Sequence, residues 1–126
     1  MLRPGNAFFP LAAGPLAHVT IVLTDPSGDP AHVVTVNLTT KTTVSDPTVT
    51  LNVGDHPSVV HPTSVAYDYL QFSRESAIQD SLRNGTLVPS VDFAADVLEY
   101  IQQGACKSKR GARDVREYCK RLFNSP

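Results

Sequence analysis

Apolar residues recur at every second position in the segments 32–40 and 48–53 of this chain, whereas after Ser73 they recur at every third or fourth position. In the stretch 32–40, HVVTVNLTT, this alternation puts Val34, Val36 and Leu38 on one face of a strand, because successive side chains of a strand point to opposite faces. All the predicted strands precede all the predicted helices, so strands and helices do not alternate along the chain. The sequence therefore predicts an α+β fold with a mostly antiparallel sheet.

Three further segments before Ser73 have strand character. Residues 18–24, HVTIVLT, and 48–53, TVTLNV, are rich in β-branched residues, and the DPSGDPA segment between 18–24 and 32–40 has the aspartate, proline and glycine of a turn. The segment PGNAFF is expected at an edge of the sheet, where a proline needs to donate no hydrogen bond. We predict a small β-barrel over about residues 4–72.

About three helices are predicted over residues 73–124. The first has Ser73 as its N-terminal cap and ends at Gly85, and the second has Ser90 as its cap and ends at Gly104. The third covers 112–123, where the apolar residues again form one stripe. These helices are too few to fold alone, so one domain is expected for residues 1–126.

Composition narrows the class of protein. The chain has 126 residues, of which 41% are hydrophobic, and a net charge of −1, which fits one globular domain. It lacks a run of 18 apolar residues, so no membrane association is predicted. Cys106 and Cys119 are too few for a disulfide scaffold and are expected to be reduced, which favours a cytoplasmic location.

Four short segments, taken in order, carry a resemblance to a known family. They are PGNAFF, then GPLAHVTIVLT, then VVTVNLTT ending at Thr39 and Thr40, then PTSVAYDYLQF with Ser64 and Tyr67. Over about residues 4–72 this layout resembles the PemK/MazF-like toxin superfamily, whose members share a small SH3-like barrel. The three predicted helices lie outside the resemblance.

The resemblance implies a function as well as a fold. It implies a toxin of a toxin-antitoxin system that cleaves single-stranded RNA without a metal ion or other cofactor, forms a homodimer and binds an antitoxin protein. Family members that cleave RNA have an arginine near the start of the second strand, where a cation can stabilise the charge that develops as the 2′-hydroxyl attacks. This chain has GPLAH there, and His18 is the nearest substitute.

The segment GDHPSVVHP contains two of the four histidines, each followed by proline. Imidazoles titrate near neutral pH, so His56 and His61 could serve as general base and general acid in RNA cleavage, with the prolines restricting the loop. The alternative is a stiff connection in which Asp55 bonds the turn backbone and the imidazoles are exposed or bonded locally. The predicted catalytic residues are His18, Thr40, His56 and His61.

A metal site is the weaker hypothesis for the same residues. Asp55, His56 and His61, together with His18 or His32, have suitable donor atoms for zinc or another transition ion. Their spacing follows no established metal-binding pattern, and both cysteines lie far away in the sequence. No metal ligand is therefore predicted.

Hydroxyl and basic side chains are candidates for contacts with RNA. Thr39, Thr40 and Lys41 offer hydroxyls and an ammonium at a strand end, although threonine is also an ordinary strand residue. Residues 104–126 carry seven positive and two negative side chains, which suits a polyanion or simply a solvated helix face. The predicted RNA contacts are Thr39, Lys41, Ser64, Lys109, Arg110 and Arg113.

A second class of function fits the same pattern. The barrel could be a non-enzymatic binding module for a protein or nucleic-acid partner, with the helices packed on it, since a fold does not determine a function. Cleavage of RNA in EDTA that depends on the histidines would distinguish the enzyme from the module.

Overall fold

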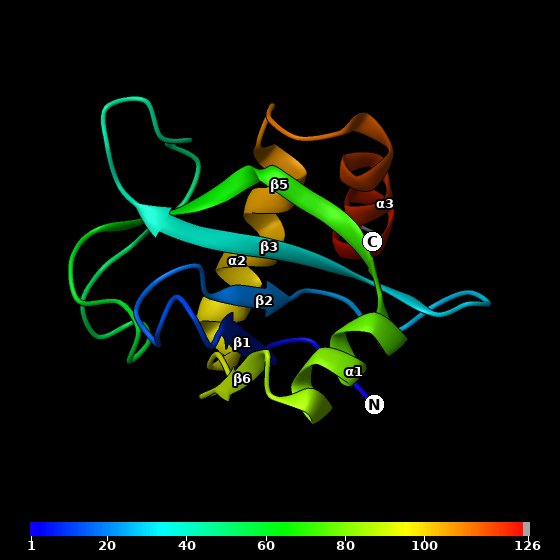
Figure 1. Cartoon of the computed structure of the whole chain (residues 1–126). Coiled ribbons are helices and arrows are strands. Elements are labelled where there is room, and N and C mark those ends of the chain that lie inside the picture. The colour runs from blue at the N-terminus through cyan, green and yellow to red at the C-terminus, as the bar shows by residue number, and fades with distance from the viewer. Residues whose placement is uncertain (125–126) are drawn as a thin grey trace.

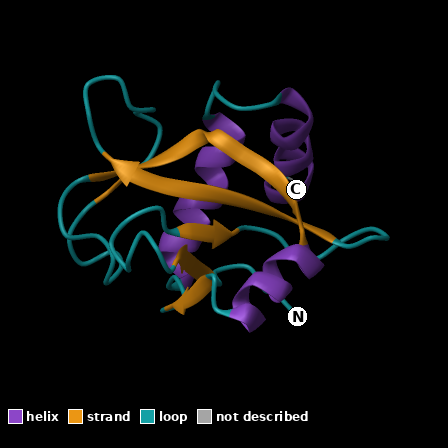
Figure 2. Cartoon of the chain, in the orientation of Figure 1, coloured by secondary structure: helices purple, strands orange, loops and turns teal. Residues whose placement is uncertain are grey.

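The computed structural model describes residues 1–124 and has six strands and three helices in that range. The sheet is antiparallel throughout, with the order β4-β5-β3-β2-β1-β6, and it curls into a half-barrel (Figures 1 and 2). The predicted α+β class is confirmed. The strands are β1 (Ala7–Pro10), β2 (Thr20–Val22), β3 (His32–Thr40), β4 (Thr50–Leu51), β5 (Thr63–Arg74) and β6 (Leu87–Ser90).

Strand β3 has the bounds that its sequence predicts and contributes to two apolar cores. Val34, Val36 and Leu38 belong to the larger core, while Val33, whose side chain points to the other face, belongs to the smaller one. Because its side chains alternate between the two faces, this strand contributes apolar residues to the core on each face of the sheet. β2 and β3 are antiparallel neighbours joined through 23–31, as the turn residues there predict.

The helices cover the two faces of the sheet unequally. Helices α2 (Ala95–Lys107) and α3 (Arg113–Phe123) pack on the inner face through the larger core. Helix α1 (Glu75–Asn84) packs on one end of the outer face through Ile78, which shares the smaller core with Leu2, Phe8, Val22 and Val33. The rest of the outer face has no helix over it (Figure 1).

The predicted start of the first helix is wrong by one residue, since Arg74 and not Ser73 is the N-cap. Ser73 still belongs to β5, and its Oγ lies 2.7 Å from the Oγ of Thr35 on the neighbouring strand. Because that hydroxyl bonds across the sheet, it does not cap a helix, and α1 begins at Glu75. The predicted end is confirmed, since Gly85 follows the helix with a left-handed φ of 84°.

Both predicted ends of the second helix are wrong. Ser90 lies in β6, opposite Ala7 of β1, and α2 begins only at Ala95. Gly104 lies inside α2, where a Cβ atom would collide with the hydroxyl of Tyr67. Glycine therefore serves close packing of the helix on the sheet at this position, and α2 continues to Lys107.

Two further predictions about the strands are wrong. β1 lies between β2 and β6 rather than at an edge, so the sheet extends beyond residues 4–72. The strand predicted over 48–53 is reduced to β4, because the chain turns where Asp55 accepts a hydrogen bond from the N–H of Asn52 (2.7 Å). Within the described residues, none of the helices has both the length and the apolar character that crossing a membrane requires.

Candidate functional site

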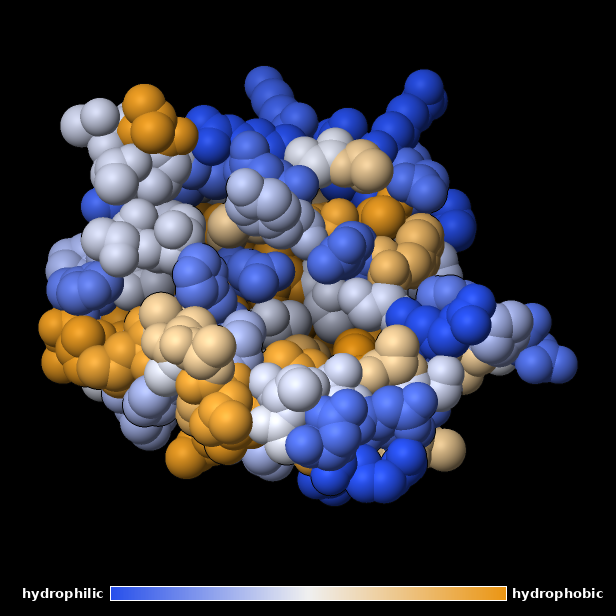
Figure 3. Space-filling view, in the orientation of Figure 1, coloured by the Kyte–Doolittle hydropathy of each residue, from blue (hydrophilic) through white to orange (hydrophobic). Residues whose placement is uncertain are grey.

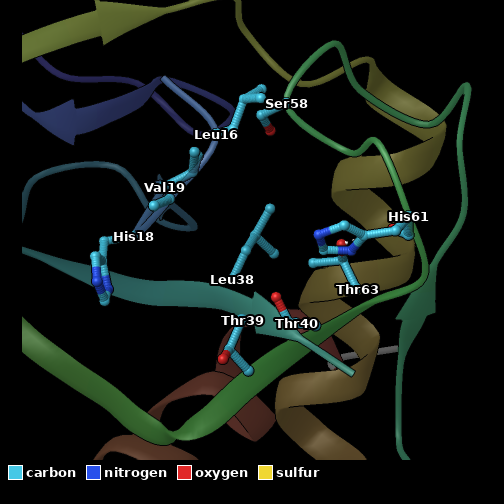
Figure 4. Close-up of a pocket in the computed structure, with 10 residues that line it drawn as sticks. Leu16, His18, Val19, Leu38, Thr39, Thr40, Ser58, His61 and Thr63 are labelled. Atoms are coloured by element: carbon cyan, nitrogen blue, oxygen red, sulfur yellow. Dashed lines mark hydrogen bonds between the residues drawn. The ribbon is translucent and has the colours of Figure 1, made fainter. Parts of the chain in front are cut away.

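A cavity of about 180 Å³ opens where β3 ends and β5 begins. It brings together four residues that the sequence singles out, namely His18, Thr39, Thr40 and His61. Figure 4 shows the side chains of His61, Thr40, Ser58 and Leu38 around one space, whereas His18 lies on the far side of Leu38 with its ring pointing away from His61. We call it the strand-end cavity, and its other lining residues are Leu16, Ala17, Val19 and Thr63.

His61 presents one ring nitrogen as an acceptor. Its Nδ1 lies 3.2 Å from the carbonyl oxygen of Pro62, so Nδ1 carries the proton and donates, and Nε2 of the neutral ring keeps its lone pair. The hydroxyl of Thr63 donates to the carbonyl of His61 (2.9 Å) and holds the loop at the start of β5. An exposed imidazole with an available lone pair can accept a proton from a bound substrate.

His56 lies buried behind the loop and does not line the cavity. Its Nε2–H donates to the carbonyl of Val91 (2.7 Å), so Nδ1 is an acceptor and takes hydrogen bonds from the hydroxyl (2.7 Å) and the N–H (3.1 Å) of Ser58. The ring also stacks on Phe93, with centroids 4.0 Å apart and an interplanar angle of 8°. His56 thus fixes Ser58, whose hydroxyl proton is engaged and whose oxygen can only accept from a ligand in the cavity.

His18 has an unusual backbone conformation at the edge of the cavity. Its φ is 55°, in the left-handed region, which a residue other than glycine adopts at a cost of about 1–2 kcal/mol. It directly precedes Val19, which is buried in the larger core. The packing of Val19 against that core holds the strained residue in place and leaves the imidazole of His18 exposed.

The predicted RNA contacts near the end of β3 have different environments. Thr39 and Thr40 are exposed and line the cavity. Lys41 does not line it, and its Nζ donates to the Oγ1 of Thr50 (3.2 Å). Ser64 is 0% exposed, so its hydroxyl is closed off from any ligand at the surface.

The predicted basic contacts lie elsewhere in the structure. Lys109 and Arg110 follow α2, Arg113 begins α3, and none of the three lines the strand-end cavity. The guanidinium of Arg110 lies 3.6 Å from the carboxylate of Asp68 and donates to the carbonyl of Val44 (3.0 Å). Arg110 therefore connects strand β5 and the loop before β4 to the segment that follows α2.

The donors considered for a metal ion do not converge. Among residues 1–124, no group of three histidine, cysteine, aspartate or glutamate side chains is placed to hold one. The carboxylate of Asp55 bonds the turn backbone at Asn52, as the stiff-connection alternative predicts, and the Nδ1 of His32 lies 2.8 Å from the carbonyl of Pro30. Asp55 and His32 are therefore each bonded within their own turn.

Both cysteines are free and buried between the last two helices. Burial raises the pKa of Cys119 to about 12 and raises that of Cys106 as well. The Sγ of Cys106 lies 3.6 Å from the carbonyl oxygen of Cys119. Because the reactive form of a cysteine is the thiolate, neither residue is suited to nucleophilic catalysis.

Sequence reasoning missed Ser58 and Thr63 as parts of the site. Ser58 lies between the two His-Pro pairs, and a serine two residues after a histidine is close enough to bond its ring, which is the signal that was available. Thr63 gave no signal of its own, because its place depends on the pairing of β5 with Thr40.

Comparisons of the chain with protein-family models, with curated proteins and with solved structures find no match.

Proposed function

We propose that the chain is a toxin-like endoribonuclease that cleaves single-stranded RNA by general acid–base catalysis, with no metal ion, in the strand-end cavity. One observation carries the proposal: His18 and His61, which come from different segments, line one cavity together with Thr39 and Thr40. Two imidazoles and several hydroxyl groups supply the proton transfers and the phosphate contacts that such a cleavage needs.

The reaction follows from the roles of these groups. Nε2 of His61 takes the proton of a ribose 2′-hydroxyl, and the 2′-oxygen attacks the neighbouring phosphorus. The bond from phosphorus to the 5′-oxygen breaks, and the imidazolium of His18 gives its proton to that oxygen. The products are a 2′,3′-cyclic phosphate and a 5′-hydroxyl. The hydroxyl of Thr40 donates to a non-bridging oxygen, and the oxygen of Ser58 accepts from the ribose.

This assignment differs from the sequence-based pairing of His56 with His61. Both ring nitrogens of His56 are engaged within the protein, so the proposal gives it a positioning role through Ser58. The second imidazole is then His18, which the resemblance to the PemK/MazF-like superfamily puts near the position of the family arginine. An SH3-like identity of the half-barrel, an antitoxin partner, a homodimer and a cytoplasmic location belong to the same proposal.

The test is cleavage of single-stranded RNA in EDTA, with detection of the cyclic phosphate. His61→Ala and His18→Ala should each lower kcat about 100-fold or more, the usual contribution of a general acid or base. His32→Ala is the matched control, because His32 is bonded in its own turn and lines a different cavity. Intact RNA, or cleavage that both substitutions leave unchanged, would overturn the proposal.

A non-enzymatic binding module is the second candidate, and a specific observation favours it. The lining of the strand-end cavity contains no lysine or arginine, so no fixed positive charge faces a phosphate there. Under this alternative the folded protein binds single-stranded RNA or a protein partner and leaves RNA intact. Binding that persists in His61→Ala without any cleavage by the wild type would support the module.

A further inference from the structure

A second cavity, of about 380 Å³, lies on the outer face of the sheet beside the first. It shares three lining residues, His18, Leu38 and Thr39, with the strand-end cavity. Its remaining lining residues are Asn37, Ala66, Tyr69 and Gln71. We call it the outer-face cavity. Figure 3 looks onto this face, where hydrophilic, weakly polar and some hydrophobic side chains border a hollow over β3 and β5. The two cavities are neighbours with a common wall.

An irregularity in strand pairing exposes an aromatic ring at this cavity. Thr35 of β3 pairs with Gln71 of β5, but Asn37 pairs with Ala66, so 67–70 form a bulge in β5. Tyr67 and Leu70 turn inward and are buried, whereas Tyr69 is 66% exposed. A bulge of this kind redirects side chains, and here it aims a flat ring away from both cores.

The chemistry of the lining suits a nucleobase better than a phosphate. None of the lining residues is a lysine, an arginine or a carboxylate. The amide of Asn37 donates from Nδ2 to the Oγ1 of Thr20 (3.2 Å), which fixes its orientation and leaves Oδ1 as an acceptor. Gln71 is exposed and offers both a donor and an acceptor. A base presents a flat π face together with donors and acceptors on its edge.

The shared wall connects this surface to the proposed chemistry. His18 lines both cavities, and its backbone lies between them with a φ of 55°. A nucleotide whose phosphate lies near His18 in the strand-end cavity can therefore place its base beyond that wall. The two cavities are therefore adjacent sections of one path that a single RNA strand can follow.

We propose that the outer-face cavity binds the base of a nucleotide adjoining the cleaved phosphate, stacked on Tyr69 and contacted at its edge by Asn37 and Gln71. The inference rests on the proposed function, since it assigns the RNA of that function a base subsite. Because the lining contains no lysine, arginine or carboxylate, recognition of the base depends on stacking and hydrogen bonds.

The test measures binding separately from cleavage. A fluorescein-labelled single-stranded RNA with 2′-fluoro riboses lacks the attacking hydroxyl, and its Kd is measured by fluorescence anisotropy. Tyr69→Ala should raise the Kd about 5- to 100-fold, whereas Tyr69→Phe, which keeps the ring, should stay within about twofold of the wild type. Tyr100→Ala is the matched control, because Tyr100 is 49% exposed on α2, which packs on the opposite face.

The outcomes separate the two proposals. Wild-type affinity in Tyr69→Ala, or no binding of the fluoro RNA by the wild-type protein, would overturn the base subsite even if unmodified RNA is cleaved. Binding that depends on Tyr69 while unmodified RNA stays intact would overturn the ribonuclease and support the subsite. Circular dichroism of each variant shows that a change in Kd comes from a folded protein.

Discussion

The two histidines of the GDHPSVVHP segment have opposite environments although they are five residues apart. His56 is 4% exposed and bonded at both ring nitrogens, whereas His61 is exposed beside the strand-end cavity. The difference arises because His56 packs on Phe93, which belongs to the larger core. At this scale, one imidazole stabilises the loop and the other is available to a ligand.

Substitution of each histidine should show which of the two stabilises the folded protein. His56→Ala removes three hydrogen bonds and a stacked ring and leaves a void, so we expect the free energy of unfolding to fall by about 2–4 kcal/mol. His61→Ala removes an exposed side chain and should change it by less than about 0.5 kcal/mol. Urea denaturation measures both values. Equal stability of the two variants would contradict the structural role of His56.

Individual residues also show why parts of the prediction failed. Ser73 has the chemistry of a helix cap but bonds Thr35 across the sheet, and Gly104 has that of a helix end but packs against Tyr67. In both places a contact between distant residues outweighs the local preference. His18, Thr40 and His61 were singled out from their types and line the candidate cavity, whereas the burial of His56 depends on Phe93, 37 positions further along the sequence.

Elements were predictable where their own sequence decides them. The alternation of β3 is strong enough to give its bounds, whereas β6 is four residues long, contains Pro89 and exists through its pairing with β1. A short strand that depends on a partner about 80 residues away leaves no periodic signal. The SH3-like layout considered for residues 4–72 could not include it.

Asp46 joins the loop before β4 to the end of α2. The hydroxyl of Ser108 donates to its Oδ2 (2.6 Å), and the N–H of Thr48 donates to its Oδ1 (2.9 Å). Burial acts to raise the pKa of Asp46, but the hydrogen bonds from Ser108 and Thr48, with the nearby charge of Arg110, outweigh it and lower the pKa below its ordinary value of 3.8. The loop is therefore held to the helix most strongly when Asp46 is ionised.

This connection should make stability depend on pH. Because the pKa is lower in the folded state, the contribution of Asp46 is present above about pH 4 and is lost as the pH falls through the folded value. Asp46→Asn should lower the free energy of unfolding at pH 7 by about 1–3 kcal/mol and flatten its fall below about pH 4. Denaturation at several pH values measures this, with Asp25→Asn as an exposed control. An unchanged pH slope in Asp46→Asn would refute the assignment.

At the scale of the whole molecule, β3 makes the two cores parts of one folded unit. The neighbouring residues Val33 and Val34 belong to different cores. Detachment of β3 would therefore disrupt both cores at once. Helices α2 and α3 close the larger core and contain both thiols. Exposure of those thiols therefore reports the release of the helices from the sheet.

Thiol labelling should follow this release. At pH 8 a thiol with a pKa of about 12, as for Cys119, is ionised in only about one molecule in 10,000, and burial also blocks the reagent. We expect almost no reaction of Cys106 or Cys119 with a disulfide reagent in the native protein and reaction of both in guanidinium. Cys119→Ser retains Cys106 as its one cysteine, so its labelling shows how much of the signal comes from each thiol. Fast labelling of the native wild type would contradict a closed helical layer.

The pairing of β6 with β1 has a consequence for the order in which the protein can be made. Translation proceeds from the N-terminus, and Ala7 to Pro10 emerge long before Leu87 to Ser90, with which they pair. Until that later segment leaves the ribosome, one edge of β1 has no partner from this chain, and an unpaired edge can attract other strands. A nascent chain stalled before residue 87 is therefore the form of this protein most in need of a chaperone.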